Sequence, residues 1–271
     1  MTPPVRLAVL GDPLRYTRSP QLHRAGAVAL GLTCESHALR TPLADLTETL
    51  ERLESSGYAG CNLTMPLKEA ALACVRAVTP RARQARSVNT ITFSGSGREG
   101  DSTDGIGFVD LIKSLDRDVA ASRVVLLGAG GAARSLALAL RDAGGGGLSV
   151  VSRREPPADE AWGGGLAAHW CAWDSAAAQA ALAAAEVVVN CTPLAGLDTP
   201  ARLGLLARGV LVVDLTYGEA LTPWVQAARA QGIEAVDGLG LLVHQARHSL
   251  MRWFGRDVPL APLAAAVGWP R

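Results

Sequence analysis

The sequence predicts an α/β fold, because strand-like apolar runs alternate with helical patterns and one strand leads into a glycine-rich turn that opens a helix. The clearest unit begins with a buried strand over residues 124–127, followed by strong helix formers over 132–140. A second strand over 148–151 completes a βαβ unit of the expected size. The same alternation on both sides of this unit extends the α/β prediction to the rest of the chain.

The N-terminal part alternates in this way. Ser19 and Pro20 predict a helix start, with Ser at the cap and Pro at the first helical position, and Gly31 predicts its end. We expect strands over 5–10, 33–39, 60–63 and 87–93, and helices over 19–30, over 43–53 and from Pro66. Asp104 or Gly105 then begins a helix of roughly ten residues that leads to the βαβ unit.

The C-terminal part continues the pattern. We expect a helix over 176–185, strands over 187–189, 210–213 and 233–236, and helices over 239–254 and 260–267. Residues 156–165, rich in Pro and Gly, predict a loop. A length of 271 residues corresponds to one or two domains.

Composition narrows the class of protein. Apolar residues make up 49% and charged residues 19% of the chain, which indicates a globular protein. The net charge of +1 gives no reason to expect nucleic acid or a membrane surface as a partner. The five cysteines are scattered without a Cys-x-x-Cys pair, as in a reducing compartment. With no signal peptide or membrane-spanning stretch in the sequence, we expect a cytoplasmic protein.

The turn of the βαβ unit has the spacing of a dinucleotide-binding fingerprint, Gly128-x-Gly130-x-x-Ala133. Gly128 allows a sharp turn, Gly130 lets a pyrophosphate approach the backbone, and Ala133 lets the helix pack close to its strand. We expect the phosphates to lie at the helix N-terminus, against the stretch Gly128, Ala129, Gly130, Gly131 and Ala132. The alternative is a plain strand–helix turn.

The end of the second strand favours NADP as the cofactor. An NAD enzyme usually has Asp or Glu there, bonded to the ribose 2′-hydroxyl. Here Ser152, Arg153 and Arg154 occupy the position, and an arginine fork can clamp a 2′-phosphate. Glu155 lies close by and leaves NAD open as the alternative.

Polar clusters follow several predicted strands, where open α/β sheets bind ligands. Their ordered set resembles the shikimate dehydrogenase family over nearly the whole chain. The most specific motif is Asn62-x-Thr64-x-Pro66-x-Lys68, followed by Val88-Asn89-Thr90 and Thr103-Asp104-x-x-Gly107-Phe108. Further matches are Thr17-x-Ser19, Asn190-Cys191-Thr192-Pro193, Asp214-Leu215-Thr216-Tyr217 and Gly238-Leu239 with Gln245.

The resemblance implies a two-domain enzyme. Residues 1–103 with the C-terminal helices of 239–271 would form the substrate domain, and residues 104–238 a Rossmann-type NADP-binding domain. The implied reaction is the reversible, NADPH-dependent reduction of 3-dehydroshikimate to shikimate in chorismate and aromatic amino-acid biosynthesis. It implies a small-molecule substrate, no metal, and a monomer or homodimer.

The resemblance also assigns roles to residues. Lys68 would be the acid–base catalyst and Asp104 its partner, also touching the substrate. Thr17, Ser19 and Tyr217 would hold the substrate carboxylate, while the other substrate contacts would be Asn62, Thr64, Asn89 and Gln245. Thr192, Leu215 and Gly238 would join the cofactor site.

Each assignment has a structural alternative. Lys68 and Gln245 fit solvated surface residues, and Asp104 and Ser19 fit helix caps. Tyr217 fits a core tyrosine with a hydrogen-bonded hydroxyl. Asn62, Thr64 and Asn89 fit turns. His244 and His248, four residues apart on a predicted helix, suggest zinc, but the sequence offers no third ligand at suitable spacing.

The sequence departs from the family pattern at both ends of the expected site. The family usually has His at Tyr16, Ser at Thr17, Asn at Arg24 and Asn at Ser102; Ser152 and Arg154 depart at the adenosine end. Two rival functions therefore stay open. One is a quinate or quinate/shikimate dehydrogenase, and the other is a nucleotide-binding sensor without catalysis, against which the presence of both Lys68 and Asp104 argues.

Overall fold

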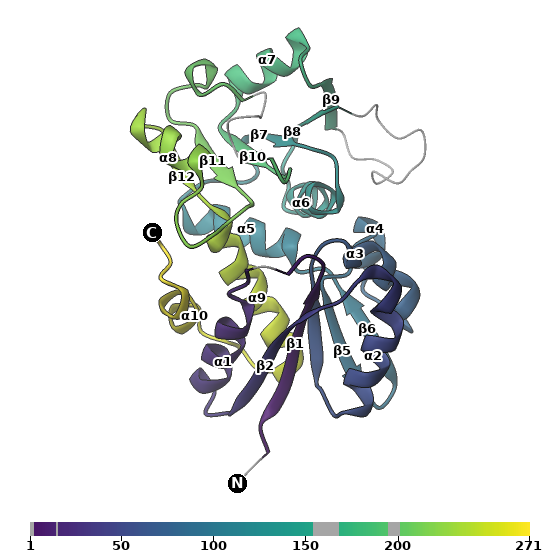
Figure 1. Ribbon diagram of the computed structural model, residues 1–271. Helices are drawn as coiled ribbons and strands as arrows, with labels where there is room; N and C mark the ends of the chain where they lie inside the picture. Colours follow the sequence, from purple (N-terminus) through teal and green to yellow (C-terminus); the bar gives the residue numbers. More distant parts are fainter. Residues whose placement is uncertain (1–2, 15, 154–167, 195–200) are drawn as a thin grey trace. The chain divides into compact units, whose positions relative to one another are not determined.

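The computed structural model describes residues 3–14, 16–153, 168–194 and 201–271 (Figure 1). It divides into two compact units, Met1–Gly107 with Leu242–Pro270, and Phe108–Leu241 with Arg271. Each unit is built on its own sheet flanked by helices. The α/β class predicted from the sequence is confirmed.

The sheet of the first unit is mixed. Its strands lie in the order β2-β1-β3-β5-β6-β4. They are β1 (Val5–Gly11), β2 (Cys34–Arg40), β3 (Gly60–Leu63), β4 (Ala77–Val78), β5 (Thr90–Ser94) and β6 (Gly97–Asp101). β1 runs parallel to β2 and β3, whereas β5 runs antiparallel to β3 and β6. The ends of β3, β5 and β6 therefore bring Asn62, Thr90 and Asp101 into register.

Helices cover both faces of this sheet. They are α1 (Ser19–Ala29), α2 (Leu46–Ser55), α3 (Leu67–Ala70), α4 (Pro80–Ala85), α9 (Gly238–Phe254) and α10 (Leu260–Val267), with the short 3-10 turns η1 (Leu43–Asp45) and η2 (Ala71–Cys74). Leu46, Leu50 and Leu53 of α2 are buried against residues of β1, β3 and β5. On the other side α1, α9 and α10 pack together, and a Cβ at Gly26 would lie 2.6 Å from Leu250 (Figure 1).

The helix start at Ser19 differs from the prediction. Ser19 is the first helical residue rather than the cap, and the cap position belongs to Arg18. The backbone N–H of Ser19 donates instead to the hydroxyl of Thr17. The predicted strand over 87–93 also begins later, at Thr90, and the sequence patterns did not predict the short elements β4, α4 and β6.

The sheet of the second unit is entirely parallel, in the order β12-β11-β10-β7-β8-β9. Its strands are β7 (Arg123–Leu127), β8 (Gly147–Ser152), β9 (Ala168–Ala172), β10 (Val187–Asn190), β11 (Leu211–Asp214) and β12 (Glu234–Val236). This is the doubly wound order of dinucleotide-binding folds, in which the strand order reverses between the first and fourth strands. The switch point lies between β7 and β10.

Helices and buried side chains complete the second unit. The helices are α5 (Asp104–Ser114), which begins in the first unit, α6 (Gly131–Asp142), α7 (Ala176–Ala184) and α8 (Pro223–Ala230), with the 3-10 turn η5 (Leu203–Leu205). Trp224 of α8 is buried with Val188 and Val212 of the central strands. β9 and α8 were not predicted from the sequence, and the predicted loop over 156–165 lies outside the described residues.

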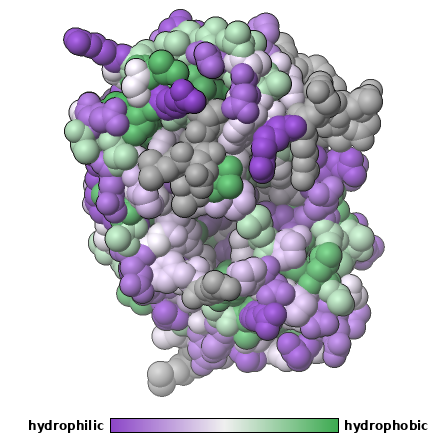
Figure 2. All heavy atoms as spheres, turned by 45° about the horizontal axis from the view of Figure 1, so that its top comes forward, coloured by the Kyte–Doolittle hydropathy of each residue, from purple (hydrophilic) through white to green (hydrophobic). Residues whose placement is uncertain are grey.

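Among the residues the structure describes, no helix combines the length and apolarity needed to cross a bilayer. On the face drawn in Figure 2, apolar side chains form separate spots among hydrophilic ones. Scattered apolar side chains of this kind are ordinary on globular surfaces.

Candidate active site

Lys68 and Asp104 form an ion pair in the first unit. Lys68 lies on the short helix α3 after β3, and Asp104 is the first residue of α5 after β6. Lys68 Nζ donates to Asp104 Oδ2 across 2.6 Å. The two side chains are 24% and 10% exposed, so the pair is largely shielded from solvent but not fully buried. Neither residue is a solvated surface group, which was the structural alternative for Lys68.

Asn89 fixes the second oxygen of Asp104. Its side-chain oxygen accepts from the Thr103 backbone N–H across 2.8 Å, and this contact determines which way the amide faces. The amide nitrogen then donates to Asp104 Oδ1, also across 2.8 Å. Both oxygens of the carboxylate are therefore held by named donors, one cationic and one neutral. Such a group is oriented before any ligand arrives.

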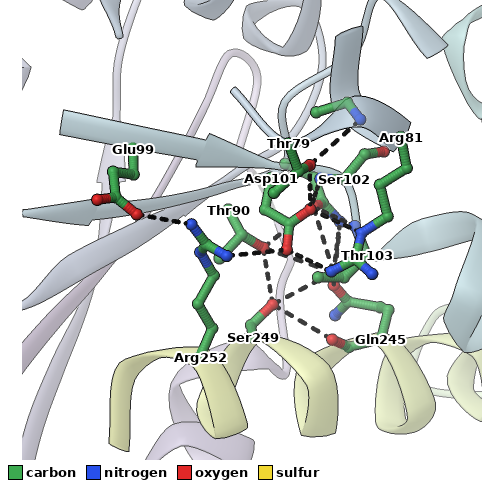
Figure 3. Close-up of polar contacts among 12 residues, drawn as sticks. Thr79, Arg81, Thr90, Glu99, Asp101, Ser102, Thr103, Gln245, Ser249 and Arg252 are labelled. Atoms are coloured by element: carbon green, nitrogen blue, oxygen red, sulfur yellow. Dashed lines mark hydrogen bonds and ion pairs between the residues drawn. The ribbon is translucent and has the colours of Figure 1, made fainter. Parts of the chain in front are cut away.

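Helix α9 contributes Gln245 and Ser249 to the polar side chains around Thr90 and Thr103 (Figure 3). The hydroxyl of Thr103 donates to Gln245 Oε1 across 3.2 Å, and Ser249 Oγ lies 2.8 Å from Thr90 Oγ1. The approach of α5 to α9 depends on Gly107, because a Cβ there would lie only 2.6 Å from the backbone nitrogen of Gln245. Thr90, Thr103 and Ser249 were not singled out as site residues from the sequence.

Asn62 lies at the end of β3 with all of its polar atoms engaged by protein groups. Its Nδ2 donates to the Asn89 carbonyl at 3.0 Å, so its Oδ1 must face His23 Nε2, 2.9 Å away. His23 Nε2 therefore carries the proton, and Nδ1 accepts from the hydroxyl of Ser36 across 2.8 Å. Burial lowers the pKa of His23 to about 4, against the effect of its bond to Asn62. The imidazole is neutral at physiological pH.

The expected carboxylate site lies at the start of α1. Thr17 Oγ1 and Ser19 Oγ lie 3.2 Å apart, and Ser19 is 5% exposed. Because Ser19 does not cap its helix, its hydroxyl is not used on the helix backbone. Arg18 Nε donates to the Tyr16 hydroxyl at 2.5 Å, and Arg24, where the family usually has Asn, donates to the Ser36 carbonyl.

The glycine-rich turn of the second unit fits a pyrophosphate. Gly128 has a φ of +101°, and a Cβ there would lie 2.8 Å from Thr192 Cγ2. A Cβ added at Gly130 would meet no heavy atom within 4 Å, so the turn has open space on that side. Helix α6 begins at Gly131, and its first N–H groups have no acceptor within the helix. These are the features of a turn that can bind an anion, and the contact with a pyrophosphate stays a prediction from the sequence.

Other expected cofactor residues gather at the carboxyl ends of β10, β11 and β12. The backbone N–H of Thr192 donates to Asn190 Oδ1, and that of Leu215 to the Asn190 carbonyl. Gly238 packs against the backbone of Leu215, because a Cβ at Gly238 would lie 2.2 Å from the Leu215 carbonyl oxygen. The half-buried Tyr217 follows on the same loop.

The adenosine end is described in part. Ser152 is buried at the end of β8, and the exposed Arg153 places its guanidinium 5.8 Å from the ring centre of Trp173. This distance is at the outer limit of a cation–π contact. Arg154 and Glu155 lie outside the described residues.

Comparison with known proteins identifies the family. Residues 9–91 match the family described as shikimate dehydrogenase substrate binding domain. A shikimate dehydrogenase (NADP(+)) of Gluconobacter oxydans is 39% identical over 259 residues, which cover 92% of this chain and 90% of the relative. The chain belongs to the shikimate dehydrogenase family. The shikimate dehydrogenase (NADP(+)) of Acidiphilium cryptum is similarly close, 40% identical over 92% of this chain and 91% of its own length.

Solved shikimate dehydrogenase structures agree with this assignment. The shikimate 5-dehydrogenase of Thermus thermophilus, solved in complex with NADP(H) and shikimate, superposes with a TM-score of 0.85 at 30% identity over 97% of this chain and 98% of that one. The Mycobacterium tuberculosis shikimate dehydrogenase gives 0.85 at 30% identity over 98% and 99%. The resemblance read from the motifs is therefore confirmed, and the substrate-binding match falls within the first compact unit.

Proposed function

We propose that this protein is an NADP-dependent shikimate dehydrogenase that interconverts shikimate and 3-dehydroshikimate. The observation that carries the proposal is the Lys68–Asp104 ion pair, 2.6 Å long and oriented by Asn89. It lies in the unit that contains the substrate-binding match of residues 9–91. The reaction belongs to aromatic amino-acid biosynthesis and makes the protein an oxidoreductase acting on a CH–OH group.

Lys68 handles the proton of the reaction. In the reductive direction its ammonium donates a proton to the carbonyl oxygen at C3 as this oxygen becomes an alkoxide. In the oxidative direction its amine removes the proton from the C3 hydroxyl. Asp104 keeps the nitrogen in line and accepts from a substrate hydroxyl. Because Asn89 and Lys68 already hold the carboxylate, its orientation needs no further ordering when substrate binds.

The rest of the first unit positions the substrate. Thr17 and Ser19 hold the carboxylate, while Thr64, Asn89 and Gln245 contact the hydroxyls; the role of Tyr217 as a third carboxylate donor stays a prediction from the motif. We assign Asn62 to the wall of the site instead of to direct contact, because its amide is engaged by His23, Asn89, Thr90 and Ser249 and does not bond to the catalytic pair, whereas the Asn89 amide bonds to Asp104. Its task is to hold the backbone of Asn89 in place.

NADP would lie on the second unit, with its pyrophosphate at the turn formed by Gly128, Ala129, Gly130, Gly131 and Ala132. We expect the 2′-phosphate to lie against Ser152, Arg153 and Arg154. The remaining cofactor contacts would come from Thr192, Leu215 and Gly238. When bound, NADPH supplies the hydride. Location in the cytoplasm and a monomeric or homodimeric state stay predictions from the sequence.

Initial rates test this function directly. We expect shikimate with NADP to give the highest kcat/KM among four combinations, shikimate or quinate with NADP or NAD. A matched Lys68→Met protein controls for contaminating dehydrogenases. Quinate differs from shikimate by an extra hydroxyl at C1. A kcat/KM for quinate at least as high as that for shikimate would favour the quinate alternative. Binding of NADP without turnover of either acid would favour the sensor.

A further inference from the structure

Asp101, at the end of β6, is a buried carboxylate that the proposed mechanism does not use. It is 1% exposed, and its Oδ1 accepts from Thr79 Oγ1 and from Arg81 Nε, both across 2.7 Å (Figure 3). Arg81 Nη2 donates to the other oxygen, which makes the contact bidentate. Burial raises the pKa of Asp101, but the bonds from Arg81 and Thr79 outweigh it and hold the pKa below its usual value.

Asp101 also forms hydrogen bonds with the backbone of the segment that leads to Asp104. Asp101 Oδ1 accepts from the Ser102 backbone N–H across 2.8 Å, which fixes the turn between β6 and α5. The Asp101 carbonyl accepts from the Asn89 N–H across 3.0 Å. The next N–H in this turn, that of Thr103, sets the direction of the Asn89 amide. Asp101 thus holds both segments that converge on Asp104.

We propose that Asp101 and Arg81 are positioning residues for the catalytic pair. Arg81, fixed on α4, holds Asp101; Asp101 holds the Ser102–Thr103 turn; and the turn sets the Asn89 amide that orients Asp104 toward Lys68. The role in turnover rests on the proposed function, whereas the effect on the Lys68–Asp104 contact does not. No bond in this relay involves the substrate.

Two neighbouring ion pairs separate this role from charge neutralisation and general stability. Arg252 of α9 lies 3.6 Å from Asp101 and donates to Glu99 across 2.9 Å, so it shares the charge without a hydrogen bond to Asp101 (Figure 3). Arg98, also on β6, pairs with Glu54 of α2 across 2.8 Å, with side chains 15% and 35% exposed. Arg98 therefore serves as the control, because its ion pair lies on the strand of Asp101 but has no contact with Asp101 or Asp104 among those described.

The test compares Arg81→Met, Arg81→Lys and Arg98→Met in the full chain. A displacement of catalytic groups by about 1 Å can lower the rate of the chemical step on the order of a hundredfold. We therefore expect Arg81→Met to lower kcat about tenfold or more. Arg81→Lys keeps the charge and one of two bonds and should fall between it and the parent. Arg98→Met should lower Tm comparably and leave kcat within about twofold.

A second readout needs neither substrate nor activity. The acetylation rate of Lys68, measured by mass spectrometry, reports whether Asp104 still holds its nitrogen. It should rise in both Arg81 variants and stay at the parent rate in Arg98→Met. An unchanged Lys68 rate in Arg81→Met and Arg81→Lys, or equal losses of kcat in Arg81→Met and Arg98→Met, would overturn the inference. A parent protein without shikimate turnover would overturn the proposed function instead, and the labelling result would still decide this one.

Discussion

The amide nitrogen of Asn89 lies 2.8 Å from Asp104 Oδ1, and this contact joins two motifs that stand apart in the sequence. Asn89 immediately precedes β5, and Asp104 begins α5 just after β6. The antiparallel pairing of β5 with β6 places Thr90 opposite Asp101, which brings the two motifs to the same end of the sheet. The sheet register therefore assembles the group that holds Lys68.

The carboxylate site gives the first prediction. Ser19→Ala and Tyr217→Phe should each weaken substrate binding by about 1–3 kcal/mol, because each removes a hydrogen bond to a charged group. The measurement is KM for shikimate at saturating NADP. Thr17→Ser keeps the hydroxyl and serves as the control, with KM close to the parent value. Unchanged KM in both Ser19→Ala and Tyr217→Phe would rule out this placement.

Cofactor selection gives the second prediction. Arg153→Ala should narrow the preference for NADP over NAD by roughly tenfold or more, because it removes a cation expected at the 2′-phosphate. Dissociation constants of NADP and NAD measured by calorimetry provide the readout. Arg123→Ala, which removes an exposed arginine paired with Glu186 in the same unit, is the control. Equal affinities for the two cofactors in the parent would contradict the assignment.

The third prediction concerns stability and pH. Burial lowers the pKa of His23 in the folded state from 6.5 to about 4, so between these values the unfolded chain binds a proton that the folded chain does not. The contribution of His23 is fully present above pH 6.5 and is lost as the pH falls toward 4. From the shift, the free energy of unfolding should drop by about 3 kcal/mol across that window.

Urea unfolding of the parent and of His23→Gln measures this effect. The variant replaces the titrating ring with an amide that can still donate to Asn62, so its unfolding free energy should vary less with pH. His37→Gln, a change at an exposed histidine of the same unit, should retain the parent slope. A slope equally steep in His23→Gln would show that another group is responsible.

Much of the fold could be predicted because several strands, such as β7, β10 and β11, consist mainly of Val and Leu. The dinucleotide turn was predicted from the spacing of Gly128, Gly130 and Ala133 together with the strand and helix around them; at Gly128 the φ of +101° and the nearby Thr192 side chain favour a residue without a side chain. β6 escaped prediction because its sequence, Gly97–Asp101, is polar and stays in the sheet through pairing with β5. The prediction that Ser19 caps its helix was wrong. The helix begins at Ser19 itself, and the hydroxyl of Thr17 accepts from the Ser19 N–H.

The candidate site was predictable only where a family motif carried it. The motif resemblance singled out Lys68 and Asp104, and the structure brings them into contact. His23 and Asp101 gave no such signal, because their importance comes from long-range partners. His23 contacts Asn62, 39 positions away, and Asp101 contacts Arg81, 20 positions away. Such contacts depend on the completed sheet and leave no local pattern in the sequence.

The central claim is that Lys68 moves the proton during turnover of shikimate, and steady-state kinetics of Lys68→Met tests it most directly. The variant keeps the length and apolar stem of the side chain but has no proton to transfer. We predict that kcat falls by about 10²–10⁴ while KM for shikimate changes much less. A folded Lys68→Met protein with kcat within about threefold of the parent would contradict the account.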